Sequence, residues 1–306
     1  MNILVTGGTG FLGGHLVRVL RDGGHVVDWS DSRYDLRDAN AASALMKWKR
    51  WDVVYHLAAR VGGIGYNRRY PANLWRDNLL MGLNVLDACR ETNAPKLVMV
   101  GTACSYPKRP QTIPFVEDEL FDGYPEETNA AYGIAKRALI AGAAAYREQY
   151  GLNVVTAIPT NLYGPGDNFD PESSHVIPAM MRKFEAAKAA GRPTVELWGT
   201  GSASRDFLFV EDAAAALVKM AGYDGLEGPV NLGSGREVSI SDLAEIMRGV
   251  VGYRGAIVWD DASPNGQPRR VLDCTRALKH LGWSAETALE DGLKKMYAWW
   301  VLQAHV

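Results

Sequence analysis

The sequence predicts an α/β protein in which a doubly wound parallel sheet is followed by a smaller C-terminal α/β lobe. Two observations support this fold class. Over the first half of the 306 residues, short apolar runs rich in β-branched residues alternate with helical stretches, a pattern typical of a parallel sheet with helices on both faces. After Pro159 the elements become shorter and are punctuated by proline and glycine, which indicates a second lobe.

The elements of the first half can be assigned in chain order. Apolar, β-branched runs predict strands at 2–6, 25–29, 53–57, 97–101 and 154–158. Helical periodicity predicts helices at 11–21, 39–48, 73–92 and 130–150. We assign residues 1–165 to the first domain and residues 166–306 to the second lobe. Residues 205–232 have the pattern of a strand and a helix that can rejoin the first sheet.

The composition argues against several classes of partner. Lysine plus arginine number 33 and aspartate plus glutamate 35, so no broad field favours nucleic acid or an anionic membrane surface. Three widely spaced cysteines without a C-x-x-C pair give neither a disulfide framework nor a metal site. The sequence has no signal peptide and no apolar run of about 18 residues, so we expect a cytoplasmic protein.

A glycine-rich turn follows the first predicted strand. In TGGTGFLGG, Gly7, Gly10 and Gly13 recur at every third position between a strand and a helix. Such glycines form a tight turn, let the backbone approach a pyrophosphate and allow the helix to pack closely on the strand. We therefore predict a Rossmann-type dinucleotide-binding domain, with Phe11 and Leu12 at the helix N-terminus that faces the pyrophosphate.

Two residues after the second predicted strand favour different cofactors. Asp31 is placed to accept hydrogen bonds from the adenosine ribose hydroxyls, which favours NAD(H). Arg33 is placed to meet a 2′-phosphate, which favours NADP(H). Asp35 and Leu36 are expected to contact adenine, with the alternative that Asp35 caps the following helix.

The third predicted strand ends in HLAA. The residues expected near the cofactor here are Leu57, Ala58 and Ala59. His56 lies on a strand that is expected to be buried, so we interpret it as a core histidine with satisfied hydrogen bonds.

Tyr132 and Lys136 are four residues apart on the helix predicted at 130–150. In a helix this spacing stacks the two side chains on one face. Taken alone, it equally fits a solvated face on which a tyrosine lies against a lysine stem.

Together, the glycine turn, the Y-x-x-x-K pair and the second lobe resemble the extended short-chain dehydrogenase/reductase family, whose members act on nucleotide sugars. Four stretches are similar to its GDP-L-fucose synthase branch, which carries out 3,5-epimerisation and 4-reduction of GDP-4-keto-6-deoxy-D-mannose. They are ARVGGIGYNRRYPA (59–72), GTACSYPK (101–108), PTNLYGPGDNFDPESSHVIPAMMRKF (159–184) and WGTGSASRDFLFVED (198–212). The resemblance covers nearly the whole chain and implies an NAD(P)-dependent oxidoreductase and isomerase of GDP-fucose biosynthesis.

The resemblance implies how C4 of the sugar is reduced. The charge of Lys136 would lower the phenol pKa of Tyr132 from about 10, and the lysine would also bind the nicotinamide ribose. Tyr132 would then exchange a proton with the C4 oxygen while hydride moves at the same carbon. Thr102 would donate a hydrogen bond to that oxygen, where the family usually has serine.

The resemblance also assigns two groups to the epimerisation. Protons on C3 and C5 are acidified by the C4 ketone, and inversion needs one group to remove a proton and another to deliver one on the opposite face. Cys104 would be the base and His175 the acid. Read from the residues alone, Cys104 equally fits an inert core position, and His175 fits a cap of the helix that starts at Val176.

Further positions are implied for substrate binding. A chain of near-zero net charge needs local cations to hold a GDP diphosphate, and Arg205 matches the family's arginine, with Arg270 and Lys183 as weaker candidates. For Lys183 a solvated surface charge is the alternative. Asn161 would orient the sugar or its phosphate. The remaining expected contacts are Asn161 and Leu162 with the cofactor, and His175, Val176 and Trp198 with the substrate.

Two departures from the family's pattern concern the cofactor. The family commonly has G-H-R-G in the glycine turn and arginine after the second strand, where this chain has GGTG and Asp31. NADP(H) is the cofactor that the resemblance implies, and Asp31 makes NAD(H) the alternative.

The same departures leave two other reactions open. They are that of an NAD-retaining nucleotide-sugar 4-epimerase and that of a 3,5-epimerase without net reduction. The intact Tyr132 and Lys136 argue against a regulator that has lost catalysis.

The quaternary state follows from two helices. The helices at 73–92 and 130–150 have apolar or alanine-rich outer faces, and relatives pair through such helices. The resemblance therefore implies a homodimer.

Overall fold

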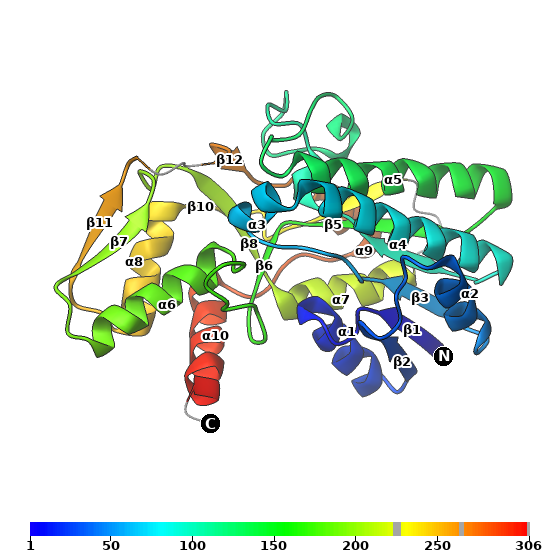
Figure 1. Ribbon diagram of the computed structural model, residues 1–306, viewed down its shortest axis with the longest axis horizontal. Helices are drawn as coiled ribbons and strands as arrows, with labels where there is room; N and C mark the ends of the chain where they lie inside the picture. The colour runs from blue at the N-terminus through cyan, green and yellow to red at the C-terminus, as the bar shows by residue number, and fades with distance from the viewer. Residues whose placement is uncertain (223–227, 263–265, 305–306) are drawn as a thin grey trace.

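The larger of two lobes is built on a six-stranded parallel sheet with strand order β2-β1-β3-β4-β5-β9 (Figure 1). The computed structural model describes residues 1–222, 228–262 and 266–304. The strands are β1 (Asn2–Thr6), β2 (Val26–Ser30), β3 (Val53–His56), β4 (Leu97–Val100), β5 (Val154–Pro159) and β9 (Pro229–Leu232). The strand order reverses between β1 and β3, and open α/β sheets bind ligands at the carboxyl ends of such strands.

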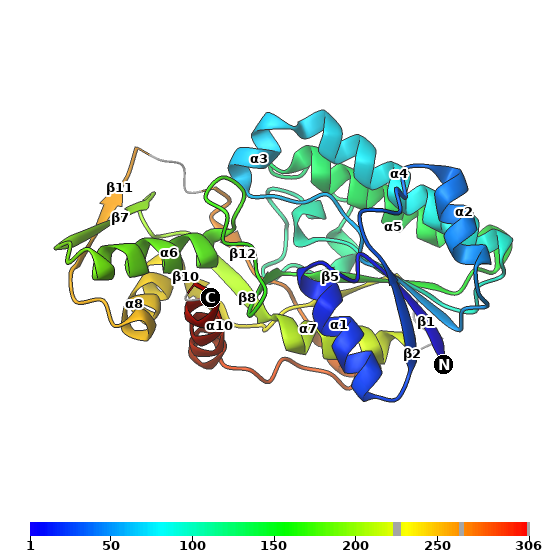
Figure 2. The same ribbon diagram turned by 60° about the horizontal axis from the view of Figure 1, so that its bottom comes forward.

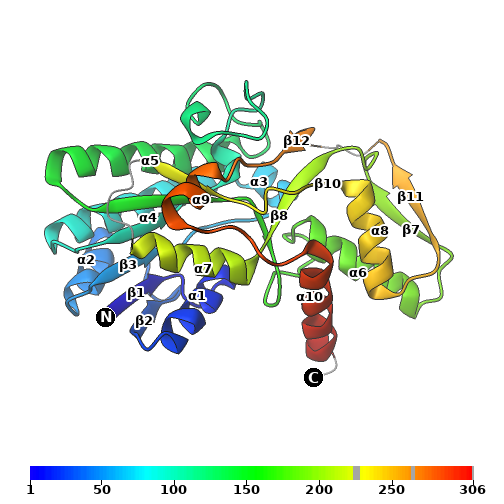
Figure 3. The same cartoon turned by 180° about the vertical axis from the view of Figure 1, so that it is seen from behind.

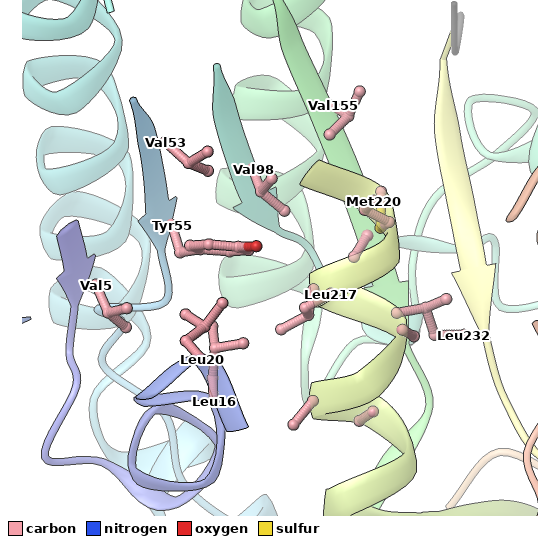
Figure 4. Close-up of a cluster of buried hydrophobic side chains, with 14 of the residues drawn as sticks. Val5, Leu16, Leu20, Val53, Tyr55, Val98, Val155, Leu217, Met220 and Leu232 are labelled. Atoms are coloured by element: carbon pink, nitrogen blue, oxygen red, sulfur yellow. The ribbon is translucent and has the colours of Figure 1, made fainter. Parts of the chain in front are cut away.

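Helices cover both faces of this sheet (Figure 2). One face carries α1 (Phe11–Asp22) and α7 (Val210–Ala221), and the other carries α2 (Ala39–Lys47), α4 (Pro71–Glu91) and α5 (Ala130–Tyr150). Successive strand residues point to opposite faces. In β3, therefore, Val53 and Tyr55 pack against α1 and α7 (Figure 4), whereas Val54 packs in the core beneath α2, α4 and α5.

The smaller lobe contains two short sheets. In the first, β8 (Ser204–Phe209) pairs with β6 (Asn161–Tyr163), β10 (Glu237–Ser239) and β12 (Arg269–Arg270). In the second, β7 (Thr194–Trp198) pairs with β11 (Ala256–Asp260). The helices are α6 (Val176–Ala189), α8 (Ile240–Val251) and α10 (Leu289–Ala304), which share one buried core with β7 and β8 (Figure 3).

Four short connecting elements complete the described part of the chain. They are α3 (Ile64–Arg69), the 3₁₀ turns η1 (Ala103–Ser105) and η2 (Glu117–Glu119), and α9 (Thr275–Leu281). Among the described residues, none of the helices is both long enough and apolar enough to cross a membrane.

The predicted fold class is confirmed, with corrections at element ends. The helix expected at 73–92 begins at Pro71, because proline suits the first helical position, whose N–H has no intrahelical partner. Of residues 205–232, α7 and β9 lie with the first sheet, but β8 does not. Its backbone is paired instead with β6, β10 and β12.

The glycine turn yields a matched pair of substitutions. A Cβ on Gly13 would lie 2.1 Å from the Gly7 carbonyl oxygen, whereas a Cβ on the exposed Gly14 would meet no atom closer than 3.9 Å. We expect Gly13→Ala to lower the free energy of unfolding by about 1–3 kcal/mol and to weaken dinucleotide binding. Gly14→Ala should raise it by about 0.5–1 kcal/mol. Urea unfolding and NADPH fluorescence titration measure both effects, and equal behaviour of the two variants would contradict the packing.

Candidate active site

The turn between β1 and α1 can accept a pyrophosphate. Gly7 has φ +71°, and its N–H donates to the Ser30 carbonyl at 3.0 Å. A Cβ on Gly7 would lie 2.8 Å from the backbone of Ala58. The helix begins after Gly10, which has no side chain to cap the first turn. The turn thus brings unobstructed backbone and a helix N-terminus to the carboxyl ends of β1 and β3, which fits a dinucleotide.

Asp31 and Arg33, which favour different cofactors, form one ion pair. The Arg33 guanidinium lies 2.7 Å from the Asp31 carboxylate, and the Arg33 backbone N–H donates to the same group at 2.9 Å. These hydrogen bonds lower the pKa of Asp31. The Arg33 side chain is 83% exposed, so its guanidinium is accessible to a 2′-phosphate.

The neighbouring positions correct two expectations. Asp38, not Asp35, caps α2 by accepting from the Asn40 N–H at 2.8 Å. Asp35 instead pairs with Arg37, whose hydrogen bonds lower the pKa of Asp35 to about 2. The Leu36 side chain is 2% exposed and packs in the core beneath α2 and α4, because the chain turns inward there. It does not offer its side chain to adenine.

The end of β3 lies against the glycine turn. The Leu57 N–H donates to the Thr6 carbonyl at 3.2 Å, and the Ala58 N–H donates to the Thr6 hydroxyl at 3.3 Å. That hydroxyl also bonds His56 Nδ1 at 2.9 Å. His56 Nε2 is buried and has no hydrogen-bond partner within the described residues, so this histidine is only half satisfied. Burial and then the charge of Lys136 lower its pKa to about 3.

Tyr132 and Lys136 lie on the inner side of α5. Lys136 is 3% exposed, and its ammonium donates to the Val100 carbonyl at 2.9 Å. Burial lowers its pKa to about 8. The pKa of Tyr132 is raised by burial and by the neighbouring Cys104, while a hydrogen bond with Thr102 opposes the rise. The pKa of the phenol is thus raised, not lowered as expected, and Tyr132 keeps its proton at neutral pH.

Thr102 and Cys104 follow β4 directly. The Thr102 hydroxyl accepts from the Cys104 N–H at 3.2 Å and so caps η1. Cys104 is a free thiol that is partly exposed, in contrast to the fully buried Cys89, which argues against an inert core role. The Arg270 guanidinium lies 3.5 Å from its sulfur.

His175 stands at the N-cap position of α6, but its ring makes no capping hydrogen bond. Only its backbone carbonyl takes part, accepting from the Ala179 N–H at 3.1 Å. Although His175 is exposed at the start of α6, partial desolvation of the ring by its surroundings and then the charge of Arg270 lower its pKa. The imidazole is thus electrostatically coupled to the same guanidinium that contacts Cys104, and the interpretation as a cap is not supported.

Arg205 and Arg270 are direct neighbours in the parallel pair of β8 and β12. The Arg270 residue is 8% exposed. Burial, and then Arg270, lower the pKa of Arg205 to about 10. The Arg270 guanidinium contacts Cys104 and that of Arg205 interacts with it electrostatically, so an anion bound here would relieve the repulsion between the two arginines.

Other expected ligand-binding residues have different surroundings. The Asn161 amide donates to the Asp206 carbonyl at 2.9 Å, and Leu162 packs against the core beneath α1 and α7. The Lys183 ammonium donates to the Glu196 carbonyl at 3.0 Å and lies 5.4 Å above the ring of Trp198, which is 68% exposed. Lys183 and Trp198 thus form a separate group on α6 and β7.

Three polar residues escaped the sequence prediction. Asn67 Oδ1 and Ser174 Oγ are buried without a hydrogen-bond partner in the described ranges. Their segments are joined, since the Gly63 N–H donates to the Ser173 carbonyl at 3.0 Å. Gln267 is 5% exposed and contacts Arg205, Arg270 and the loop after Cys104. Asn67 and Ser174 lie in two of the stretches that carry the resemblance, 59–72 and 159–184, but neither residue was singled out there.

The chain matches a known family over most of its length. The model of the NAD dependent epimerase/dehydratase family matches residues 3–233. GDP-L-fucose synthase 1 of Arabidopsis thaliana is 43% identical over 304 residues, which cover 98% of this chain and 93% of that protein. GDP-L-fucose synthase of Escherichia coli (strain K12) is 39% identical over 310 residues, with 98% and 96% covered.

A solved structure extends the match to three dimensions. The structure of a GDP-L-fucose synthetase from Naegleria fowleri bound to NADP has a TM-score of 0.90 and 30% sequence identity, and the match covers 100% of this chain and 95% of that one. Both lobes are therefore part of the similarity. No group of three or more His, Cys, Asp or Glu side chains able to hold a metal ion occurs within the described ranges.

Asp167 predicts an unusual dependence of stability on pH. It lies in the loop after β6, 7% exposed, with no hydrogen-bond partner for Oδ2 among the described residues. The neighbouring Pro165 carbonyl bonds His15 of α1 at 2.7 Å, so the loop rests against the helix of the glycine turn. Burial raises the pKa of Asp167 to about 7, whereas an unfolded chain releases this proton near pH 4.

Between about pH 4 and pH 7 the native state therefore holds a proton that the unfolded state has lost, and stability falls as pH rises. The loss amounts to as much as about 4 kcal/mol. Asp167→Asn, which does not titrate, should gain stability relative to the wild type by this amount between pH 4 and pH 8. Urea unfolding of both proteins across this range measures the difference in the free energy of unfolding. If this free energy depended on pH in the same way in both proteins, the raised pKa of Asp167 would be disproved.

Proposed function

The chain belongs to the NAD dependent epimerase/dehydratase family, and on this premise we propose that it converts GDP-4-keto-6-deoxy-D-mannose, or a close analogue, to GDP-L-fucose. The enzyme is an NAD(P)-dependent epimerase and oxidoreductase of GDP-sugars. The observation that carries the proposal is the grouping of Cys104, Tyr132 and Thr102 from the larger lobe with Arg270 and His175 from the smaller lobe.

The epimerisation needs a base and an acid. Cys104, as thiolate, would remove the proton from C3 or C5, and the negative charge would delocalise onto the C4 oxygen as an enolate. His175 would return a proton to the opposite face of the same carbon. The proton on sulfur then passes to solvent and the imidazole takes one up, so both groups are ready for the second carbon.

The reduction uses the other pair. Bound NADP(H) supplies the hydride that adds to C4. Tyr132 would give its hydroxyl proton to the C4 oxygen, and its raised pKa keeps this proton in place until it is needed. The Thr102 hydroxyl would hydrogen-bond the same oxygen. Lys136 would hold the nicotinamide ribose, with its ammonium already fixed at the Val100 carbonyl.

NADP(H) is the cofactor. The residues that would hold it are the Gly7–Gly13 turn, Ala58 and Arg33. Arg33 would exchange its bonds with Asp31 for bonds to the 2′-phosphate, a step that its exposure permits. The Arg33 guanidinium, placed beside both anions, would then offset part of the repulsion between the freed Asp31 carboxylate and that phosphate.

The same Asp31 favours a second candidate, a nucleotide-sugar 4-epimerase or 3,5-epimerase that retains NAD. Such an enzyme oxidises and re-reduces C4 with no net consumption of reductant. Stoichiometric oxidation of added NADPH by GDP-4-keto-6-deoxy-D-mannose would exclude it. Release of tightly bound NAD on denaturation, without NADPH oxidation, would support it instead.

We further propose that the active form is a cytoplasmic homodimer joined through α4 and α5. These helices lie side by side on one outer face of the larger lobe (Figures 1 and 2). In α4 the apolar side chains of Trp75 and Leu83 are exposed, and α5 exposes the small side chains of Ala138 and Ala141. A reducing cytoplasm would keep Cys104 as the free thiol that the reaction requires.

Substitutions of the two catalytic groups should separate the two reactions. Tyr132→Phe is expected to slow NADPH oxidation about 100-fold or more, because the C4 oxygen loses its proton donor, while deuterium exchange at C3 and C5 continues. Cys104→Ser should suppress the deuterium exchange by a similar factor. Mass spectrometry of the sugar in D₂O and NADPH absorbance follow the two reactions.

The matched control for these variants is Tyr146→Phe, which removes a hydroxyl from the same helix. That hydroxyl bonds Asp87 at 2.6 Å, so both reactions should proceed at the wild-type rate. Normal NADPH oxidation in Tyr132→Phe would remove the tyrosine from the mechanism. Normal exchange in Cys104→Ser would do the same for the cysteine.

The dimer proposal predicts that a charge on α4 dissociates the protein. Leu83→Arg is expected to convert a dimer to a monomer, because a guanidinium would be buried in an apolar interface without a partner. Leu302→Arg on α10, where the leucine is 68% exposed, is the control and should leave the mass unchanged. Sedimentation equilibrium measures both, and a wild-type monomer or a dimeric Leu83→Arg variant would refute this interface.

A further inference from the structure

The buried guanidinium of Arg270 lies between two side chains. Its Nη1 is 3.5 Å from Cys104 Sγ, and its Nε donates to Gln267 Oε1 at 3.0 Å. The sequence suggested this arginine as a ligand for the GDP diphosphate. In the structure two of its nitrogens, Nη1 and Nε, are directed at the thiol and at a buried amide. Arg270 therefore lies at the proton-transfer end of the site.

Gln267 links this arginine to the larger lobe. Its Nε2 donates to the Lys108 carbonyl at 2.9 Å, in the loop that leaves η1 four residues after Cys104. Its own carbonyl accepts from Arg205 Nη1 at 2.6 Å. One buried residue thus fixes the positions of both arginines relative to the segment that carries the thiol.

The charged and titratable groups around Cys104 come from four elements. Tyr132 of α5 and Arg205 of β8 face it, Arg270 of β12 contacts it, and His175 at the start of α6 faces Arg270. Glu126, before α5, faces Arg205. Among these groups it is the thiol that the Arg270 guanidinium contacts directly.

We propose that Arg270 is a positioning residue for the epimerisation: held by Gln267, it aims the sulfur of Cys104 and stabilises it as the thiolate that removes the sugar proton. An N–H donor at this distance bonds a thiolate more strongly than a thiol, because the acceptor is charged. The thiol proton is released to solvent, and the thiolate then forms its S–H bond with the proton from C3 or C5. This inference deepens the proposed function and rests on it for its role in the reaction.

The thiolate can be measured without substrate. Alkylation by iodoacetamide consumes the thiolate form, so its rate against pH reports the ionisation of Cys104 in the full-length protein. Cys104→Ser supplies the background from Cys89 and Cys274. Arg270→Met is expected to slow alkylation at pH 7 about tenfold and to shift the rate profile upward by about one pH unit. Gln267→Met should shift the profile in the same direction by less.

Arg269→Met is the matched control, since it removes the same charge one residue away. The Arg269 side chain is half exposed, and its Nε and Nη2 donate to the two carboxylate oxygens of Glu237 at 2.7 and 2.6 Å. The alkylation profile of Arg269→Met should coincide with that of the wild type. Circular dichroism and NADPH binding establish that each variant is folded. If Arg270→Met does not fold, the alkylation profiles of Arg270→Lys and Gln267→Met test the proposal in its place. Both profiles should be shifted to higher pH.

An Arg270→Met profile that coincides with that of Arg269→Met would overturn the proposal, as would unshifted Arg270→Lys and Gln267→Met profiles. Failure of the proposed function has a different signature. In that case GDP-4-keto-6-deoxy-D-mannose would show neither deuterium exchange nor NADPH oxidation, while the alkylation profile would still move with Arg270.

Discussion

The close packing of α5 against the segment that follows β4 is the constraint on which the site depends. A Cβ at Gly133 would lie 2.3 Å from the Cys104 carbonyl oxygen, so only glycine allows this approach. The contact is fixed by polar bonds in both directions. Lys136 donates to the Val100 carbonyl, and the Ser105 hydroxyl donates to the Gly133 carbonyl at 3.1 Å. This packing brings the phenol of one element and the thiol of another to the same place.

The smaller lobe completes the site because the chain crosses between the two sheets. β5 belongs to the first sheet and β6, two residues later, pairs with β8 in the second. The parallel register of β12 with β8 then places Arg270 beside Arg205. Neither lobe alone holds the full set of groups, so ligands that bind between them have access to groups from both lobes.

Sequence reasoning succeeded where the chemistry is local. The glycine turn and the Y-x-x-x-K pair depend on spacings within one or two elements, and the structure has both the tight turn and the shared helix face. Sequence reasoning failed where a property of a residue depends on its burial or on contacts with residues far away in the chain. The prediction that Lys136 lowers the pKa of Tyr132 was wrong. Desolvation raises this pKa, and desolvation depends on how the whole site packs. Gln267 has no local signal, because the partners that join it to the rest of the site, Arg205 and the Lys108 carbonyl, lie 62 and 159 residues earlier in the chain.

The surroundings of the two adjacent acid–base groups assign their roles in opposite directions. Burial favours the neutral form of the Tyr132 phenol, which suits a proton donor. Cys104 instead contacts the Arg270 guanidinium, and under the proposed function a positive charge at this position suits a group that takes a proton from the sugar. When two neighbouring groups have surroundings that favour opposite protonation states, one group is suited to act as the acid and the other as the base. The proposed two-step chemistry thus uses different surroundings for the two side chains: the phenol bonds Thr102 within the larger lobe, and the thiol contacts Arg270 of the smaller one.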